Sequence, residues 1–153
     1  MGDKGDGLRV AVVAACFNGE LVGNLLKRVR EVLSAAGVAP GDLEIVRVPG
    51  THELPYAVNE LARSEGFHCV VALGVVIAGQ TDHHHMIGTN TSRALQDISI
   101  SARVPVINGT VVVNDRAQAE ARCGGKIDRG GEFARAAIEM GRMAQRFRDD
   151  RES

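Results

Sequence analysis

Short apolar runs rich in β-branched residues alternate along this chain with segments of helical periodicity. The run from Cys69 to Ile77 is apolar or glycine at every position, which is typical of a strand buried on both faces of a parallel sheet. The last run is interrupted by Asn108-Gly109, a turn-favouring dipeptide, and we expect the strand to break there. The pattern predicts four strands: Arg9–Cys16, Leu43–Val48, Cys69–Ile77 and Val104–Val113.

An amphipathic helix is predicted after the first strand. Leu21, Leu25, Val29 and Leu33 recur at helical spacing and define its inner face. Asn18 precedes them, and its side-chain oxygen can accept a first-turn N–H and so cap the helix.

Further helices are predicted after the later strands. One begins with Pro55 near its first turn, another ends at about Ser101, and a short one spans Asp115–Arg122. The glycine-rich loop Cys123–Gly131 leads to a last helix. The residues of that helix expected to face inward are Phe133, Ala137, Met140, Ala144 and Phe147.

Strands and helices in strict alternation predict an α/β fold. Four βα units in series give a four-stranded parallel sheet with helices on both faces, a three-layer α/β/α sandwich. A length of 153 residues suits one domain over residues 1–153, with residues 1–7 and 149–153 frayed. Ligands of such sheets bind outside the carboxyl ends of the strands, so the segments after each strand are the candidate site.

Charge and cysteine usage narrow the classes of function. With 18 Lys+Arg against 19 Asp+Glu, the chain has no overall electrostatic attraction to nucleic acid or an anionic membrane. The longest apolar run, Cys69–Gly79, is too short to span a bilayer, and the start MGDKGDG lacks an apolar signal segment. The three cysteines form no CxxC pair, which favours reduced thiols. We therefore expect a cytoplasmic protein without nucleic-acid or membrane partners.

Each strand-end segment has an ordinary structural interpretation beside a functional one. Phe17 is either a core residue or a stacking platform for a flat heterocycle. Glu53 either complements a helix dipole or accepts hydrogen bonds from ligand hydroxyls. Arg122, Lys126 and Arg129 form either a solvated basic loop or a charge-assisted phosphate site. The residues alone do not decide between the two interpretations in each case.

The segment Gly79–His83 opens a helix directly after a buried strand. Unpaired backbone N–H groups make such a position a natural anion site, and the absence of Walker A and GxGxxG patterns favours a single phosphate. His83-His84-His85 is a poor metal site, because consecutive residues seldom ligate one ion. One histidine acting in proton transfer is the favoured interpretation, without a metal.

Taken in order, these segments resemble the 6,7-dimethyl-8-ribityllumazine synthase family of riboflavin biosynthesis. The resemblance covers about Leu8 to Ala144 and rests on V-x-x-x-x-F-N, V-P-G-x-x-E-L-P, L-G-V-V-I-x-G-Q-T-x-H, P-V-I-N-G-T-V, R-x-G-G-K and A-I-E-M-G. It implies a flavodoxin-like sandwich assembled as homopentamers, which in some members build icosahedral shells. It also implies condensation of 5-amino-6-(D-ribitylamino)uracil with 3,4-dihydroxy-2-butanone 4-phosphate, releasing phosphate and water without a cofactor.

The resemblance assigns roles by position. Phe17 would stack on the pyrimidine, Glu53 would accept ribityl hydroxyls, and His83 would be the acid/base. Gln80 and Thr81 would offer amides to the phosphate, while Asn108, Arg122 and Arg129 would reach in from a neighbouring subunit. The remaining residues of the ribityl and heterocycle site would be Asn18, Thr51, His52, Val75, Val76 and Ile77.

The chain departs from the family pattern at several positions. His52 replaces an apolar or aromatic residue, Ala78 replaces a common basic one, and His84-His85-Met86 replaces aromatic–acid–aromatic. The last loop is one residue short, so matching Arg129 to the usual lysine requires a gap. Two rival hypotheses follow: a lumazine- or flavin-binding homologue without catalysis, and a metal protein that uses His52 with the three consecutive histidines.

Overall fold

A four-stranded, all-parallel sheet forms the centre of the molecule. The computed structural model describes residues 4–80 and 83–153. The strands are β1 (Val10–Ala15), β2 (Leu43–Val48), β3 (Cys69–Ile77) and β4 (Val106–Val113), in the order β2-β1-β3-β4. All three neighbouring pairs of strands are parallel, so the carboxyl ends of the four strands lie at the same end of the sheet.

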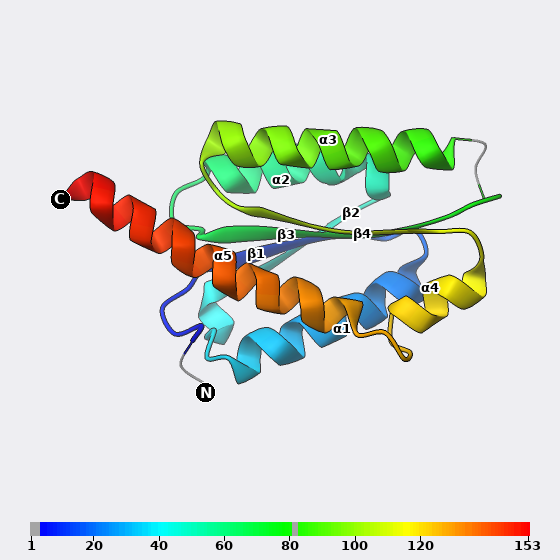
Figure 1. Ribbon diagram of the computed structural model, residues 1–153, viewed down its shortest axis with the longest axis horizontal. Coiled ribbons are helices and arrows are strands. Elements are labelled where there is room, and N and C mark those ends of the chain that lie inside the picture. The colour runs from blue at the N-terminus through cyan, green and yellow to red at the C-terminus, as the bar shows by residue number, and fades with distance from the viewer. Residues whose placement is uncertain (1–3, 81–82) are drawn as a thin grey trace.

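Helices cover both faces of this sheet (Figure 1). On one face lie α2 (Leu54–Arg63) and α3 (His84–Ala102); on the other lie α1 (Gly19–Ala35), α4 (Arg116–Arg122) and α5 (Arg129–Glu152). Single 3₁₀ turns at Pro40–Asp42 and Thr51–Glu53 precede β2 and α2. The predicted three-layer, flavodoxin-like α/β/α sandwich is confirmed.

Two apolar clusters form the core, one on each face of the sheet. Val10, Val12 and Ala14 of β1 point to the cluster under α1 and α5, whereas Ala11 and Val13 point to the cluster under α2 and α3. The helical periodicity of α1 is confirmed, because its leucines and valines at the predicted spacing are buried. The two clusters hold the strand ends, and therefore the site, in fixed positions.

β4 differs from its prediction. It begins at Val106 rather than Val104 and continues without a break through Asn108-Gly109, since Ala72 and Leu73 of β3 pair with those two residues. A side chain at Gly109 would lie 2.5 Å from the Ala72 carbonyl oxygen, so glycine serves close packing here rather than a turn.

α5 extends to the described end of the chain. It begins at Arg129, inside the predicted loop, and continues to Glu152. At the other end, the Arg142 guanidinium donates to the carbonyl oxygens of Lys4 and Asp6. Phe147, predicted to face inward, is exposed and lies under the Arg146 guanidinium.

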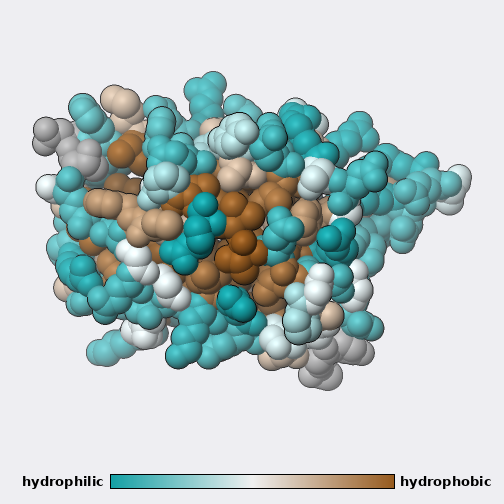
Figure 2. Space-filling model, turned by 180° about the vertical axis from the view of Figure 1, so that it is seen from behind, coloured by the Kyte–Doolittle hydropathy of each residue, from teal (hydrophilic) through white to brown (hydrophobic). Residues whose placement is uncertain are grey.

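The β2 edge of the sheet is only partly covered. Leu43, Ile45, Val46 and Val48 of β2 are all half-buried. An apolar area occupies the middle of the face opposite to that of Figure 1, the side on which β2 lies (Figure 2). Among the helices of the described residues, none is both long and apolar enough to cross a membrane.

Candidate active site

A pocket of about 170 Å³ lies at the carboxyl ends of β1, β2 and β3, and we call it the strand-end pocket. Its position agrees with the rule that ligands of such sheets bind beyond the strand ends. It brings together residues from four segments of the sequence that meet only in the folded chain. Its lining consists of Phe17, Gly50, Thr51, His52, Glu53, Val75, Val76, Ile77, Gln80 and Ile87.

Phe17 is a surface residue of this pocket. Its side chain is 57% exposed, which excludes the interpretation of Phe17 as a core residue. Its backbone N–H donates to the Pro49 carbonyl oxygen at 2.9 Å, so the loop after β1 is tied to the loop after β2. An exposed aromatic face held by its backbone is suited to stacking on a planar ligand.

Asn18 joins two strand-end loops rather than capping α1. Its backbone is left-handed (φ 56°), a conformation that asparagine tolerates, and its side chain makes no capping hydrogen bond. The side-chain amide donates to the Val75 carbonyl oxygen at 2.8 Å and exchanges hydrogen bonds with the Gln80 amide at 3.0 and 3.2 Å. The capping prediction is therefore wrong, and Asn18 instead fixes Gln80 against β3.

The segment before α2 supplies the polar wall of the pocket. Thr51 is buried, and its side chain lies against Gly74 of β3, where any Cβ would approach the Thr51 Oγ1 to 2.6 Å. His52 and Glu53 are exposed beside it. The glycine at position 74 thus permits the approach of Thr51 to the strand.

His83 lies immediately before α3. It occupies the N-cap position, and its carbonyl oxygen accepts the Ile87 N–H at 2.9 Å, while Ile87 lines the pocket. The His83 side chain is exposed and is not among the pocket-lining groups. His84 and His85 stack on each other, with ring centroids 4.0 Å apart. Thr81, a predicted phosphate contact, lies outside the described residues.

The remaining predicted site residues lie at the open edge of β4. Arg122, the last residue of α4, and Arg129, the first of α5, line a separate cavity of about 240 Å³, here called the edge cavity. The Arg122 guanidinium donates to the Gln118 carbonyl oxygen, and Arg129 pairs with Glu132 at 2.8 Å. The other residues lining the edge cavity are Thr110, Val111, Val112 and Phe133.

Asn108 lies apart from both cavities. Its side-chain oxygen accepts the Thr110 N–H at 3.0 Å, and its amide donates to the Ser92 hydroxyl at 2.9 Å. The strand-end pocket contains neither arginine, and the edge cavity contains none of the residues that line the strand-end pocket. The described chain therefore does not bring Asn108, Arg122 or Arg129 into the strand-end pocket.

Sequence reasoning missed Gly50 and Ile87 in the strand-end pocket and Thr110 and Phe133 in the edge cavity. Ile87 carried a usable signal, because it lies one helical turn beyond His83. Phe133 was predicted to face inward and is half-buried, so only its place beside the arginines was unforeseen. Gly50 and Thr110 carry no distinctive signal, since glycine is ordinary in a turn and threonine is ordinary in a strand.

The cysteines and the metal-binding residue types add little chemistry to the site. Burial raises the pKa of Cys69 to about 12 and that of Cys123 to about 11, so both thiols are protonated and unreactive near neutral pH. Cys16 is exposed beside Phe17. Within the described residues, no three histidine, cysteine or carboxylate side chains are grouped to hold a metal ion.

Comparison with known proteins gives the family. The family model of 6,7-dimethyl-8-ribityllumazine synthase matches residues 7–145. The chain belongs to the 6,7-dimethyl-8-ribityllumazine synthase family. Proteins of that name from Pyrococcus furiosus and Aquifex aeolicus are both 37% identical to it, over 97% and 94% of this chain and 93% and 94% of their own lengths. The relative from Thermococcus gammatolerans is 35% identical over 95% of this chain and 93% of its own.

Membership in the lumazine synthase family confirms the resemblance on which the sequence interpretation rested. The chain is an enzyme of riboflavin biosynthesis. The strand-end pocket contains eight of the residues that the resemblance assigned to substrate binding: Phe17, Thr51, His52, Glu53, Val75, Val76, Ile77 and Gln80. The roles of these residues remain predictions.

Proposed function

We propose that this chain condenses 5-amino-6-(D-ribitylamino)uracil with 3,4-dihydroxy-2-butanone 4-phosphate to give 6,7-dimethyl-8-ribityllumazine, phosphate and water. The observation that carries the proposal is the strand-end pocket. It combines an exposed aromatic face, a carboxylate and an anchored amide at the ends of adjacent strands. A planar ring bearing a polyol chain requires that combination of groups.

The strand-end pocket would hold the ribitylaminouracil. Phe17 stacks on the pyrimidine ring, and the backbone of residues 75–77 lies against the ring edge. Thr51 and the carboxylate of Glu53 hydrogen-bond the ribityl hydroxyls, with His52 beside them. Asn18 contributes by holding Gln80, since its own amide is already bonded to Gln80 and to the Val75 carbonyl oxygen.

The butanone phosphate would bind beyond Gln80 and Thr81. Arg122 of a neighbouring subunit supplies the bidentate guanidinium that a phosphate favours, with Arg129 beside it in the edge cavity and Asn108 contributing from β4. The separation of the edge cavity from the strand-end pocket within one chain supports a shared site. A homopentamer provides that arrangement, because a closed ring repeats one head-to-tail junction at every subunit.

The chemistry requires orientation and proton transfer. The amine at C5 of the uracil attacks the ketone carbon, and loss of water leaves an imine. Elimination of phosphate leaves an enol, which tautomerises to a carbonyl. The ribityl-bearing nitrogen attacks that carbonyl and closes the ring with loss of a second water. Holding both substrates in reactive geometry can supply roughly 7–11 kcal/mol of the barrier reduction. His83 moves protons between the amine, the departing water and the phosphate, with an effect of about 10²–10⁴-fold.

Turnover of the two substrates tests the proposal. The purified chain is mixed with both compounds, and lumazine fluorescence and free phosphate are followed together. We expect both signals to rise in parallel. Fluorescence or absorbance changes on binding of lumazine, without phosphate release from the substrates, would instead establish the non-catalytic binding homologue.

A pair of aromatic variants connects the activity to the pocket. Phe17→Ala removes the stacking surface and is expected to raise the KM for the uracil substrate by about 5-fold or more, as loss of an aromatic contact of about 1 kcal/mol predicts. Tyr56→Ala is the matched control, because Tyr56 is 74% exposed on α2 and does not line the pocket. Equal kinetic effects of the two changes would contradict the assignment of the pocket.

A further inference from the structure

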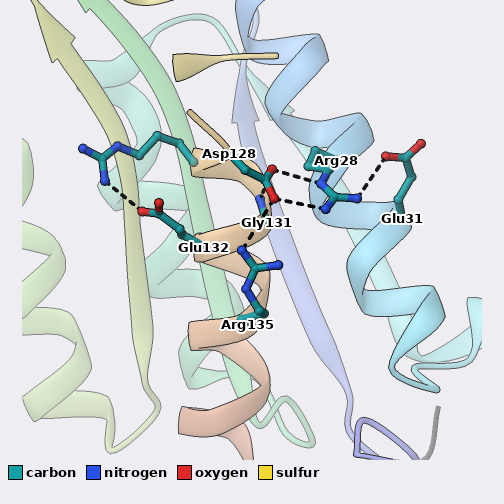
Figure 3. Close-up of polar contacts among 7 residues, drawn as sticks. Arg28, Glu31, Asp128, Gly131, Glu132 and Arg135 are labelled. Carbon is teal, nitrogen blue, oxygen red and sulfur yellow. Dashed lines mark hydrogen bonds and ion pairs between the residues drawn. The ribbon is translucent and has the colours of Figure 1, made fainter. Parts of the chain in front are cut away.

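An ion pair joins the middle of α1 to the beginning of α5. The Arg28 guanidinium donates to both carboxylate oxygens of Asp128, at 2.9 and 3.0 Å, and the two side chains face one another across the gap between the helices (Figure 3). The two residues are one hundred positions apart in the sequence. The contact is therefore tertiary, and it fixes one segment of the fold relative to another.

Asp128 performs a second task in the same place. Its carboxylate accepts the Gly131 N–H at 3.1 Å and so caps α5, and Arg135 of the next turn approaches it to 3.5 Å (Figure 3). The Arg28 hydrogen bonds, the Gly131 N–H and the nearby positive charges lower the pKa of Asp128 to about 2. Asp128 is therefore an anion throughout the range in which an enzyme of this kind is assayed.

The loop that ends at Asp128 is also held by backbone contacts. It begins after Arg122 and is closed by an antiparallel bridge between Cys123 and Asp128 and by the Ile127 N–H bond to the Ala121 carbonyl oxygen. A cavity of about 430 Å³ is lined by residues of α1 and of the loop, and by Arg122 and Arg129 at the ends of the loop. Arg28 and Asp128 both line this cavity, and their ion pair joins its α1 side to its loop side.

Close backbone contact at the start of α5 makes this bridge sensitive to position. A Cβ at residue 130 would lie 2.8 Å from the Arg28 Cβ and 3.0 Å from the Leu25 carbonyl oxygen. A Cβ at residue 131 would collide with the Asp128 carboxylate. Gly130 and Gly131 thus allow the first turn of α5 to lie directly against Arg28.

Arg122 and Arg129 lie at the two ends of this anchored loop, and both line the edge cavity. We propose that Asp128 and Arg28 are positioning residues, which hold the loop so that Arg122 and Arg129 both face the edge cavity. This inference rests on the proposed function, in which Arg122 binds the butanone phosphate. Asp128 and Arg28 act through the two arginines and do not touch substrate.

The exposure of the pair indicates positioning rather than stabilisation. The Arg28 and Asp128 side chains are 44% and 41% exposed, and ion pairs exposed to that extent add little to stability. Their bidentate geometry nevertheless fixes orientation, because two parallel N–H···O bonds restrict rotation as well as distance. Loss of the pair should therefore alter binding geometry at the edge cavity while the fold survives.

Two uncharged polar variants test the proposal. Asp128→Asn keeps an oxygen for the Gly131 N–H but loses the charge and the bidentate pair, and Arg28→Gln removes the partner. Each is expected to raise the KM for butanone phosphate by about 5- to 20-fold, less than the roughly 100-fold cost of a full 1 Å misplacement. The KM for the uracil substrate and the midpoint of thermal unfolding should stay near the wild-type values.

Glu31→Gln is the matched control. Glu31 contacts the same arginine at 3.7 Å from within α1, so the variant removes one carboxylate charge from Arg28 without touching the loop. We expect wild-type kinetics. Arg28→Lys should fall between wild type and Arg28→Gln, because lysine keeps the charge and loses the fork. The Asp128→Asn/Arg28→Gln double variant should be no worse than either single variant, since both remove one contact.

Unchanged KM for butanone phosphate in both single variants would overturn the proposal. So would equal increases for both substrates, an additive double variant, or a Glu31→Gln effect as large as that of Asp128→Asn.

Amide hydrogen exchange tests the positioning role of Asp128 and Arg28 even if the proposed function fails. If the wild-type chain makes no lumazine, the proposed function fails, and the positioning claim is judged on amide exchange. Asp128→Asn and Arg28→Gln should then accelerate exchange in residues 123–131 by about 10-fold or more while Glu31→Gln does not, because loosely held segments open more often. Equal exchange in all four proteins would refute the positioning claim by itself.

Discussion

Single side chains at the strand ends determine how the loops of this site are held together. Asn18 bridges two loops through its side-chain amide, and it does so from a left-handed backbone position. Thr51 reaches β3 only because residue 74 lacks a side chain. The geometry of the pocket therefore depends on small residues that do not themselves carry chemistry.

His83 is expected to be the proton-transfer residue of the site. His83→Ala should lower kcat by about 100-fold or more, the lower end of the range for loss of an acid/base group, and should leave the assembly intact. His84→Ala is the matched control, since His84 is the next residue and stacks on His85. A large kcat loss for His84→Ala with none for His83→Ala would reverse the assignment.

Gly74→Ala should damage the ribityl end of the pocket. The added methyl would lie 2.6 Å from the Thr51 Oγ1 and 3.2 Å from the Leu54 Cδ1, so Thr51 must move away from β3. We expect a raised KM for the uracil substrate and a loss of about 1–3 kcal/mol in the free energy of unfolding, as overpacking predicts.

Gly23→Ala is the control for Gly74→Ala. It adds the same methyl within α1, where nothing beyond the neighbouring residues and the backbone of the helix itself lies within 4 Å, and should stabilise the chain by up to about 1 kcal/mol. Substrate KM values should not change in this control. A Gly74→Ala protein with an unchanged KM for the uracil substrate would show that Thr51 does not contribute to the pocket.

At the scale of whole elements, the order of strands and helices could be predicted because the apolar periodicity is strong. The errors lie where local preference and tertiary packing disagree. Asn108-Gly109 favours a turn by itself, but pairing with β3 keeps both residues in β4. Asn18 favours a cap, but its amide bonds to Gln80 and β3 instead.

The candidate site was predictable for a related reason. The carboxyl ends of parallel strands lie at the same end of the sheet, so residues after β1, β2 and β3 converge whatever their chemistry. No such rule predicts where Arg122 and Arg129 lie relative to β4, the strand at the side of the sheet. The pairing of Arg129 with Glu132 and the bridge from Asp128 to Arg28 depend on how α5 lies against the loop and α1, which only the folded chain shows.

His68 links the beginnings of β1 and β3 and should make the stability of the sheet depend on pH. The His68 Nδ1 accepts the Arg9 backbone N–H at 2.9 Å, and the His68 backbone N–H donates to the Arg9 carbonyl oxygen at 2.8 Å. Burial, followed by the charges of Arg148, Arg9 and Arg142, lowers the pKa of His68 below its usual 6.5. The unfolded chain therefore binds more protons than the folded chain between those two pKa values.

The contribution of His68 is thus fully present above about pH 6.5 and is lost as the pH falls through the folded-state pKa. His68→Asn keeps an acceptor for the Arg9 N–H and removes the titration. Urea unfolding from about pH 8 to pH 5 should show a smaller decline for His68→Asn than for the wild-type chain. Identical declines would mean that His68 does not titrate differently in the folded and unfolded chains.

At the scale of the whole molecule, the strand-end pocket and the edge cavity are separate. The strand-end pocket joins the ends of β1, β2 and β3, whereas the edge cavity lies along β4 at the edge of the sheet. A second chain would bring the groups of the two cavities together if its edge cavity lay against the strand-end pocket of the first. In the proposed function, assembly is therefore a condition of catalysis.

Mixed rings provide the test of that condition. His83→Ala and Arg122→Ala chains, each nearly inactive alone, are unfolded and reassembled together. If His83 comes from one subunit and Arg122 from its neighbour, random mixing places both intact groups at about one quarter of the junctions, and activity should approach about one quarter of the wild-type value. Rings of each variant reassembled alone are the control. If mass-labelled subunits are proven to mix and no activity returns, both groups act within one chain, and the site is not shared.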